Sequence, residues 1–363
     1  MRITVIAPPW YPVPPTGYGG IELVVALETE ALVSRGHDVT LIASAGSTTR
    51  AHLHSPFDPP PPPDALGSVE RGHAWFEAAH AADAYAVARA FEAEVIHDHS
   101  GIIGPVIGAS VASPPVVHTL HGPWNPFSSD LYSRIHNRIH LVAISDRQRV
   151  ENPHVRYAGL VYNGIDLAAY TVQPAKQDYL AYIGRANPEK VPDRTIKLAR
   201  AAGMPLKMII KRNEPAEQDY WNAKVAPLLG DDIEIFEGVS ATEKDALLGA
   251  ARAMLFPIQW PEPFGLVMAE ALACGTPVVT CPAGAAPEIV AHEVTGIVAS
   301  SDDALVKGLQ RAWEGAFSAD ACRARVERMF SASTMAAGYE RLFQQVCSGL
   351  VPDAPAGTGA LTQ

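Results

Sequence analysis

Charged residues are scarce in this sequence, where Asp, Glu, Lys and Arg together make up 18% of the 363 positions. An average globular chain carries roughly 25%, and intrinsically disordered chains combine low hydrophobicity with high charge. Because 48% of the residues are hydrophobic, the chain can bury two sizeable cores, and its length is typical of two domains. The net charge of -11 argues against nucleic acid as a partner and against a polybasic membrane surface.

Cysteines and uninterrupted apolar runs are also few. The four cysteines lie in the last third of the chain without paired spacing, which predicts reduced thiols rather than a disulfide framework or a zinc site. The first apolar run is broken by Pro8 and Pro9 and does not resemble a secretion signal. The longest apolar stretch, 102–117, contains glycines and prolines that exclude a membrane span. We therefore expect a soluble, cytoplasmic protein with no transmembrane segment.

Short apolar runs alternate with helical patterns along the whole chain. This alternation is typical of βαβ units, whose right-handed crossovers place the strands in a parallel, doubly wound sheet. The pattern restarts after a polar stretch, so the sequence predicts two α/β domains with a boundary near residue 170. We expect strands at 2–7, 37–43, 94–97, 116–120, 140–144, 158–162, 179–183, 206–210, 233–236, 253–256, 277–280 and 296–298.

The most informative segment is EPFGLVMAEALACG, residues 262–275. Glu262 and Glu270 are its only charged residues, and the rest is apolar nearly all round. A solvated helix face is the ordinary explanation for such glutamates, but this helix has no polar face, so we expect both carboxylates to bind a ligand. The helix should begin near Phe264 and offer free backbone N–H groups to anionic oxygens, those of Phe264, Gly265 and Leu266.

Two further segments contain residues that could bind a phosphate group. Arg185 and Lys190 follow the first strand of the second half, and a forked guanidinium beside a point charge can clamp phosphate oxygens, although isolated cations on a loop are usually only solvated. Gly19 and Gly20, in PPTGYGGIE, lie between a strand and a helix, where backbone amides meet phosphate or simply form a tight turn. The spacing does not match G-x-G-x-x-G, so a dinucleotide site is not expected.

Histidines provide the remaining candidates. His121 follows the strand at 116–120, where it either lines a binding site or is a hydrogen-bonded loop residue. His97 and His99 lie on one face of a strand and could indicate a metal. We find no third ligand at a suitable spacing and no Asp-x-Asp motif, so we predict that the protein has no metal site.

The two glutamates eight positions apart, in E-P-F-G-L-x-x-x-E-A-x-A-x-G, resemble the signature of retaining glycosyltransferases of the family-four group, which have the GT-B fold. The resemblance extends over roughly residues 2–345. It implies two doubly wound Rossmann-like domains that face a central cleft. It also implies that Glu262 contacts the donor sugar, that Glu270 holds the ribose, and that Arg185 and Lys190 bind the diphosphate.

The same resemblance assigns three more residues: Gly19 and Gly20 would lie over the diphosphate, and His121 would approach the reacting sugar. Gly238 follows a strand of the second half, where we expect it to border the nucleotide base. The sequence departs from the family in having Val191 where glycine is common, which affects the loop that carries Lys190.

The domain expectations follow from this resemblance. Residues 1–170 would form the acceptor-side domain and 171–330 the domain that binds the nucleotide sugar. Residues 331–350 would form a helix that packs back on the N-terminal domain, and 351–363 a flexible tail.

The resemblance implies an enzyme that moves a sugar, with retention of configuration, from a nucleotide-diphosphate sugar to an acceptor. The donor would be a UDP-sugar, attack would occur on the front face, and neither metal nor cofactor would be needed. The sequence leaves the acceptor open among small molecules, glycans and lipid-linked compounds. A nucleotide-sugar 2-epimerase of the same fold and a non-catalytic nucleotide-sugar-binding protein remain as alternatives.

Overall fold

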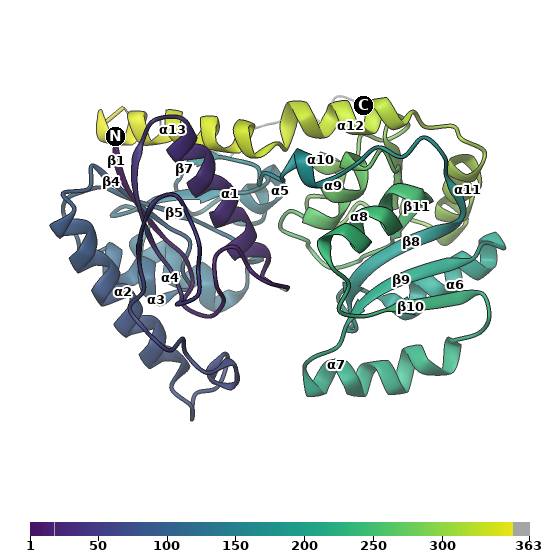
Figure 1. Ribbon diagram of the computed structural model, residues 1–363, viewed down its shortest axis with the longest axis horizontal. Helices are drawn as coiled ribbons and strands as arrows, with labels where there is room; N and C mark the ends of the chain where they lie inside the picture. Colours follow the sequence, from purple (N-terminus) through teal and green to yellow (C-terminus); the bar gives the residue numbers. More distant parts are fainter. Residues whose placement is uncertain (18, 351–363) are drawn as a thin grey trace. The chain divides into compact units, whose positions relative to one another are not determined.

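The computed structural model describes residues 1–17 and 19–350, and the expected flexible tail lies outside the described residues. The chain divides into two compact units (Figure 1). The first unit contains Met1–Gly164 together with the chain from Ala332 onward, and the second contains Ile165–Ser331.

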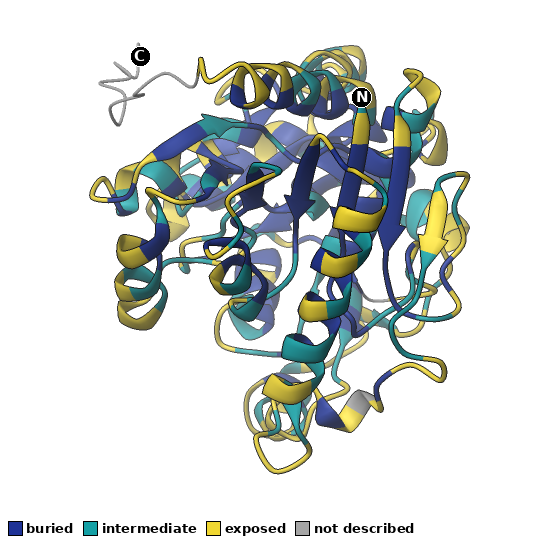
Figure 2. Cartoon of the chain, turned by 90° about the vertical axis from the view of Figure 1, so that its left-hand side faces the viewer, coloured by how far each residue is buried: buried dark blue, intermediate teal, exposed yellow. Residues whose placement is uncertain are grey.

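The first unit is built on a seven-stranded parallel sheet in the order β3-β2-β1-β4-β5-β6-β7. Its central strands are almost wholly buried, as expected for a parallel sheet (Figure 2). The strands are β1 (Arg2–Ile6), β2 (Asp38–Ile42), β3 (His52–His54), β4 (Val95–Asp98), β5 (Val116–Thr119), β6 (His140–Ala143) and β7 (Tyr157–Leu160). The accompanying helices are α1 (Gly20–Ser34), α2 (His73–Ala90), α3 (Ile103–Gly108), α4 (Pro126–Ile135), α5 (Asp146–Glu151) and α13 (Ala332–Cys347).

Pairing of β4 with β5 brings two loops together at one edge of this sheet. Asp98 at the end of β4 lies opposite His118 near the end of β5. The segments that follow these strands, which carry His99 and His121, are therefore neighbours. Helix α13 packs against α1 and brings residues from the end of the described chain into the same unit (Figure 1).

The second unit has a six-stranded parallel sheet in the order β10-β9-β8-β11-β12-β13. Strands β8 (Gln177–Arg185) and β11 (Ala251–Phe256) pair at its centre, so the loops that follow them lie side by side. The other strands are β9 (Leu206–Lys211), β10 (Ile233–Phe236), β12 (Val278–Thr280) and β13 (Gly296–Val298). The main helices are α6 (Pro192–Ala202), α7 (Pro215–Tyr220), α8 (Ala241–Ala250), α9 (Leu266–Ala273), α10 (Ala286–Ile289), α11 (Asp302–Trp313) and α12 (Ala319–Met329).

The structure confirms the alternating α/β pattern and each strand expected from the sequence, with ends that agree to within two residues. Strand β3 was not expected. It is a three-residue edge strand, HLH, whose first two residues are exposed, so it lacks the apolar run by which buried strands are recognised (Figure 2).

Candidate functional site

Lys190 and Glu262 form an ion pair beyond the carboxyl ends of β8 and β11. The Nζ atom of Lys190 contacts Oε2 of Glu262, and the same oxygen accepts a hydrogen bond of 2.9 Å from Nε1 of Trp260. Only 18% of the Lys190 side chain and 12% of the Glu262 side chain are exposed. The Trp260 ring lies 5.3 Å from Nζ and adds a cation–π contact. The ion pair is therefore held in a partly dry environment, where charges interact more strongly than in water.

The backbone of Glu262 is held by the loop after β12. The N–H of Ala285 donates a 2.8 Å hydrogen bond to the carbonyl oxygen of Glu262. Gly284 has φ of +54°, and a Cβ atom at that position would overlap the Glu262 backbone. Only glycine permits this approach, so the loop determines where the Glu262 carboxylate lies.

Helix α9 begins at Leu266, two residues later than we expected from the sequence. Gly265 precedes it with φ of 89° and ψ of 62°, a left-handed conformation that excludes Gly265 and Phe264 from the helix. The Phe264 side chain is buried against Phe330, with ring centroids 5.6 Å apart. The expectation of a helix start near Phe264 is therefore wrong, and the N–H groups of the first turn begin at Leu266 and Val267.

Arg185 ends β8 and lies against two carboxylates that the sequence did not lead us to expect. Its Nη2 donates to Glu214 at 2.9 Å, and its Nε donates to Glu217. The second oxygen of Glu217 accepts from the backbone N–H groups of Asn213 and Glu214 at 2.8 and 3.1 Å. Burial opposes ionisation of Glu217, but Arg185 and these N–H groups lower its pKa. Glu217 is thus fixed as a carboxylate and orients the guanidinium.

Glu270 lies on α9, with 5% of its side chain exposed. Its Oε1 accepts a 2.8 Å hydrogen bond from Nζ of Lys244 on α8. Burial raises the pKa of the nearby Tyr170 hydroxyl, and the Glu270 charge raises it further, so the tyrosine remains a hydrogen-bond donor. Lys244 and Tyr170 therefore compensate the buried Glu270 carboxylate. The sequence motif gave no indication of either residue.

The loop between β8 and α6 contains the position at which the sequence departs from the family pattern. Val191 has φ of 46° and ψ of 50°, which is left-handed and unusual for a β-branched residue. The loop therefore adopts a backbone that suits glycine, although it carries valine. The carbonyl of Lys190, the preceding residue, accepts a 2.8 Å hydrogen bond from the Tyr182 hydroxyl.

The structure brings some of the expected residues together and separates others. Lys190 contacts Glu262, and a Cβ atom at Gly265 would lie 3.2 Å from Cγ of Glu262. Gly238 lies apart, in an exposed turn after β10, and a Cβ atom there would have no neighbour within 4 Å among the described residues.

In the first unit, Gly19 is the N-cap residue of α1 and Gly20 its first helical residue. A Cβ atom at Gly19, which has φ of +151°, would lie 2.9 Å from a carboxylate oxygen of Glu22. Burial raises the pKa of Glu22 to about 7, so about half of these carboxyl groups are protonated and uncharged at neutral pH. The turn is therefore compatible with an anion near the start of α1.

His121 lines a cavity of about 390 Å³ in the first unit. Aromatic rings contribute to its wall, among them Trp10, Trp124 and Tyr132. Trp10 is stacked on His73, with ring centroids 4.7 Å apart. Apolar ring faces beside polar groups suit the binding of a polyhydroxylated ligand. Burial lowers the pKa of His121 well below its usual value, and the neighbouring His99 lowers it further, so the imidazole is neutral at pH 7.

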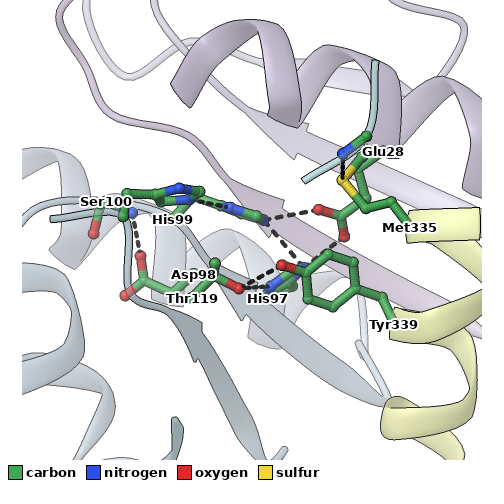
Figure 3. A network of polar contacts seen from close by, with 10 residues as sticks. Glu28, His97, Asp98, His99, Ser100, Thr119, Met335 and Tyr339 are labelled. Carbon is green, nitrogen blue, oxygen red and sulfur yellow. Dashed lines mark hydrogen bonds and ion pairs between the residues drawn. The ribbon is translucent and has the colours of Figure 1, made fainter. Parts of the chain in front are cut away.

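His97 and His99 both contact Glu28 of α1, a third polar partner that we did not find in the sequence. The ligand atoms of these three residues lie within 4.8 Å of one another, close enough for a metal ion. Each carboxylate oxygen already faces an imidazole nitrogen, at 2.6 Å for His97 and 3.0 Å for His99 (Figure 3). Oε1 of Glu28 is hydrogen-bonded to His97, whereas Oε2 has, among the described residues, only the ion-pair contact with His99, and the expectation of no metal site stays a prediction. A signal for Glu28 was present, because it shares the i, i+4 face of α1 with the buried residues Val24 and Leu32.

Two protein-family models match the chain. Residues 18–169 match the model described as Glycosyltransferase Family 4, and residues 168–329 match the model described as Glycosyl transferases group 1. The chain belongs to this family of glycosyltransferases.

Curated relatives of this glycosyltransferase include D-inositol 3-phosphate glycosyltransferases. The enzyme of Mycolicibacterium smegmatis is 29% identical over 175 residues, which are 44% of this chain and 38% of the relative. That of Mycobacterium avium is 34% identical over 136 residues, or 36% of this chain and 31% of the relative. The chain thus aligns with less than half the length of these two relatives.

Solved structures match this glycosyltransferase over nearly its whole length. AviGT4, a glycosyltransferase involved in avilamycin A biosynthesis, is 26% identical with a TM-score of 0.71 and covers 96% of this chain and 98% of its own. Sucrose-phosphate synthase from Thermosynechococcus elongatus is 20% identical with a TM-score of 0.77, covering 96% and 99%. Anabaena HepE in complex with UDP is 18% identical with a TM-score of 0.72, covering 95% and 100%. These similarities confirm the GT-B fold.

In the described part of this glycosyltransferase, every helix is too short or too polar to span a lipid bilayer.

Proposed function

We propose that this protein transfers a sugar from a nucleotide-diphosphate sugar to an acceptor, with retention of configuration at the anomeric carbon. The observation that carries the proposal is the ion pair between Lys190 and Glu262, which lies beside the start of α9 in a chain of this glycosyltransferase family. A cation, a carboxylate and free backbone N–H groups are the chemistry that a sugar diphosphate requires.

In this proposal the second unit binds the donor. Arg185 and Lys190 meet the diphosphate charge, the first turn of α9 adds N–H donors, and Glu270 accepts hydrogen bonds from the ribose hydroxyls. Glu262 accepts hydrogen bonds from the sugar hydroxyls, and Gly238 borders the base. Preorganised positive charge of this kind stabilises the leaving nucleoside diphosphate as the bond to the sugar breaks.

The first unit contributes the remaining groups. Gly19 and Gly20 approach the diphosphate, His121 contacts the reacting sugar, and the aromatic cavity around His121 holds the acceptor. The acceptor attacks from the face that the diphosphate leaves, and the departing phosphate oxygen takes its proton. A sugar or another polyol fits this cavity best, since it offers ring faces to Trp10 and hydroxyls to the polar groups.

We expect uridine diphosphate to stabilise the fold more than guanosine or thymidine diphosphate. The HepE structures that share this fold include complexes with UDP and with UDP-glucose. A ligand at 100 times its Kd stabilises a protein by about 2.7 kcal/mol, which differential scanning fluorimetry detects as a higher melting temperature. A larger shift with either other nucleotide contradicts the choice of uridine. Incubation with a panel of UDP-sugars then tests the activity: slow donor hydrolysis supports transfer, whereas a 2-epimeric sugar nucleotide or an unchanged donor contradicts it.

We also expect donor binding to need no divalent metal. Arg185, Lys190 and the start of α9 can together meet the diphosphate charge, so a metal would add little to affinity. Isothermal titration of UDP with and without excess EDTA should give the same Kd. A tenfold loss of affinity in EDTA, about 1.4 kcal/mol, would contradict this expectation.

A further inference from the structure

A continuous chain of buried polar groups extends from Tyr339 of α13 to His99 within the first unit (Figure 3) and continues to His121. The Tyr339 hydroxyl lies 2.9 Å from Oγ1 of Thr119, which lies 2.8 Å from Nε2 of His97. Nδ1 of His97 lies 2.6 Å from Glu28. The same carboxylate lies 3.0 Å from Nε2 of His99.

The chain ends at the cavity. Nδ1 of His99 lies 2.9 Å from Nε2 of His121, whose ring lines the cavity. Glu28, His97 and His99 are almost entirely inaccessible to solvent. Water therefore cannot replace any of these hydrogen-bond partners, and each donor in the chain must face an acceptor of the protein.

The direction of each hydrogen bond follows from the carboxylate. Burial alone would raise the pKa of Glu28, but its contacts with His97 and His99 lower it, so Glu28 is ionised and only accepts. Nδ1 of His97, 2.6 Å from Oε1, must then carry a proton. Nε2 of His99 lies 3.0 Å from Oε2 of Glu28 and 3.1 Å from this protonated nitrogen, so it can only donate, to Glu28. Burial lowers the pKa of His99, so it is neutral and has one proton, on Nε2. Its Nδ1 can only accept, and the N–H of His121 must point at it.

We propose that Glu28 is a positioning residue that acts through His99 to place the proton of His121 on Nε2. Nδ1 of His121, on the ring that lines the cavity, is then the unprotonated atom and accepts a hydrogen bond from a hydroxyl of the bound sugar or acceptor. The consequence for catalysis rests on the proposed transferase function. The proton arrangement itself does not, and it is measured without substrate.

Replacing Glu28 by leucine should reverse the positions of the protons on His99 and His121. Nε2–H of His99 would lose the carboxylate and face only Nδ1 of His97, 3.1 Å away, which cannot accept while it keeps its own proton. The His99 proton should therefore move to Nδ1 and donate to His121, whose own proton would then lie on Nδ1. Long-range ¹H–¹⁵N spectra of protein labelled in histidine distinguish the two tautomers. A His121→Gln variant assigns the His121 signals. Glu28→Gln keeps the side-chain volume and one acceptor oxygen, so only part of the His121 population should change to the tautomer protonated on Nδ1. This variant also provides the test if Glu28→Leu does not fold.

Thr29→Val is a matched control. Thr29 is the next residue of α1, is equally buried, and its hydroxyl has no hydrogen-bond partner among the described residues. This variant should keep the wild-type tautomer. In donor-hydrolysis or transfer assays, Glu28→Leu should lower kcat about tenfold through the loss of one correctly polarised hydrogen bond, with UDP affinity unchanged.

Several results would overturn the proposal. Wild-type His121 protonated on Nδ1, an unchanged tautomer in both Glu28 variants, or a tautomer change without any loss of kcat would each do so. Stoichiometric zinc or another metal in the purified protein, released by Glu28→Leu, would show that the cluster binds a metal instead. A wild-type protein that is inactive with all donors would contradict the proposed function, while the spectra would still decide the proton arrangement.

Discussion

Replacing Glu262 by glutamine is expected to lower turnover by about a hundredfold or more while UDP binds nearly as tightly as before. The sugar ring flattens and gains positive charge as the diphosphate leaves, so the contact with a carboxylate strengthens in the transition state. UDP lacks the sugar and does not use this contact. An interaction made mainly in the transition state affects kcat rather than binding.

The structure makes glutamine a suitable replacement at this position. It keeps the acceptor for Trp260 Nε1, and the backbone remains held by Ala285. It loses the negative charge that faces Lys190. The substitution therefore changes the charge of the site with little change in shape.

Glu270→Ala is expected to weaken binding rather than turnover, the opposite of Glu262→Gln. A carboxylate that holds ribose acts equally in the ground and transition states, so its loss should raise Kd for UDP and KM for the donor with less effect on kcat. Glu293→Gln, which alters an exposed ion pair with Arg311, should change neither quantity. Loss of UDP binding in Glu262→Gln with normal binding in Glu270→Ala would reverse the two assignments. Normal activity in both would contradict the glycosyltransferase mechanism.

Lys190→Met is expected to lower both UDP affinity and turnover, each by about tenfold to a hundredfold, because a charged hydrogen bond contributes roughly 1.5–3 kcal/mol. The variant removes the cation that we assign to the diphosphate. It also leaves Glu262 without its counter-ion in a site where only 12% of the glutamate side chain is exposed. Calorimetric titration of UDP and steady-state kinetics with the donor measure the two effects separately.

The double variant Lys190→Met/Glu262→Gln separates these two roles. If Lys190 only compensates Glu262, any loss of UDP affinity in Lys190→Met should be reversed in the double variant, and our diphosphate assignment is wrong. If Lys190 binds phosphate as proposed, the double variant should retain the loss of UDP affinity. Lys197→Met is the matched control, because that lysine lies nearby on α6 with 61% of its side chain exposed and should leave both quantities unchanged.

The fold class and the main candidate residues could be predicted from local patterns in the chain. Alternating apolar runs and helical patterns reveal parallel strands because a strand buried on both faces is mostly apolar. Glu262 and Glu270 were recognisable for a related reason, since two carboxylates in an apolar segment require a polar partner or a ligand. Strand β3 and the start of α9 were missed because an exposed edge strand has no apolar run and because Gly265 takes up a left-handed backbone.

Which side chains contact one another depends on how the chain folds in three dimensions. Lys190 lies 72 positions from Glu262, Arg185 lies 32 from Glu217, and Glu28 lies 69 from His97. Local patterns report the environment of one residue and contain no information on its partner. Sheet topology supplies that information, because β8 and β11 are neighbours although two strands separate them in the chain. Glu28 shows the difference most clearly: its place on an apolar helix face was visible in the sequence, but its histidine partners are known only from the contacts that join α1 to the end of β4.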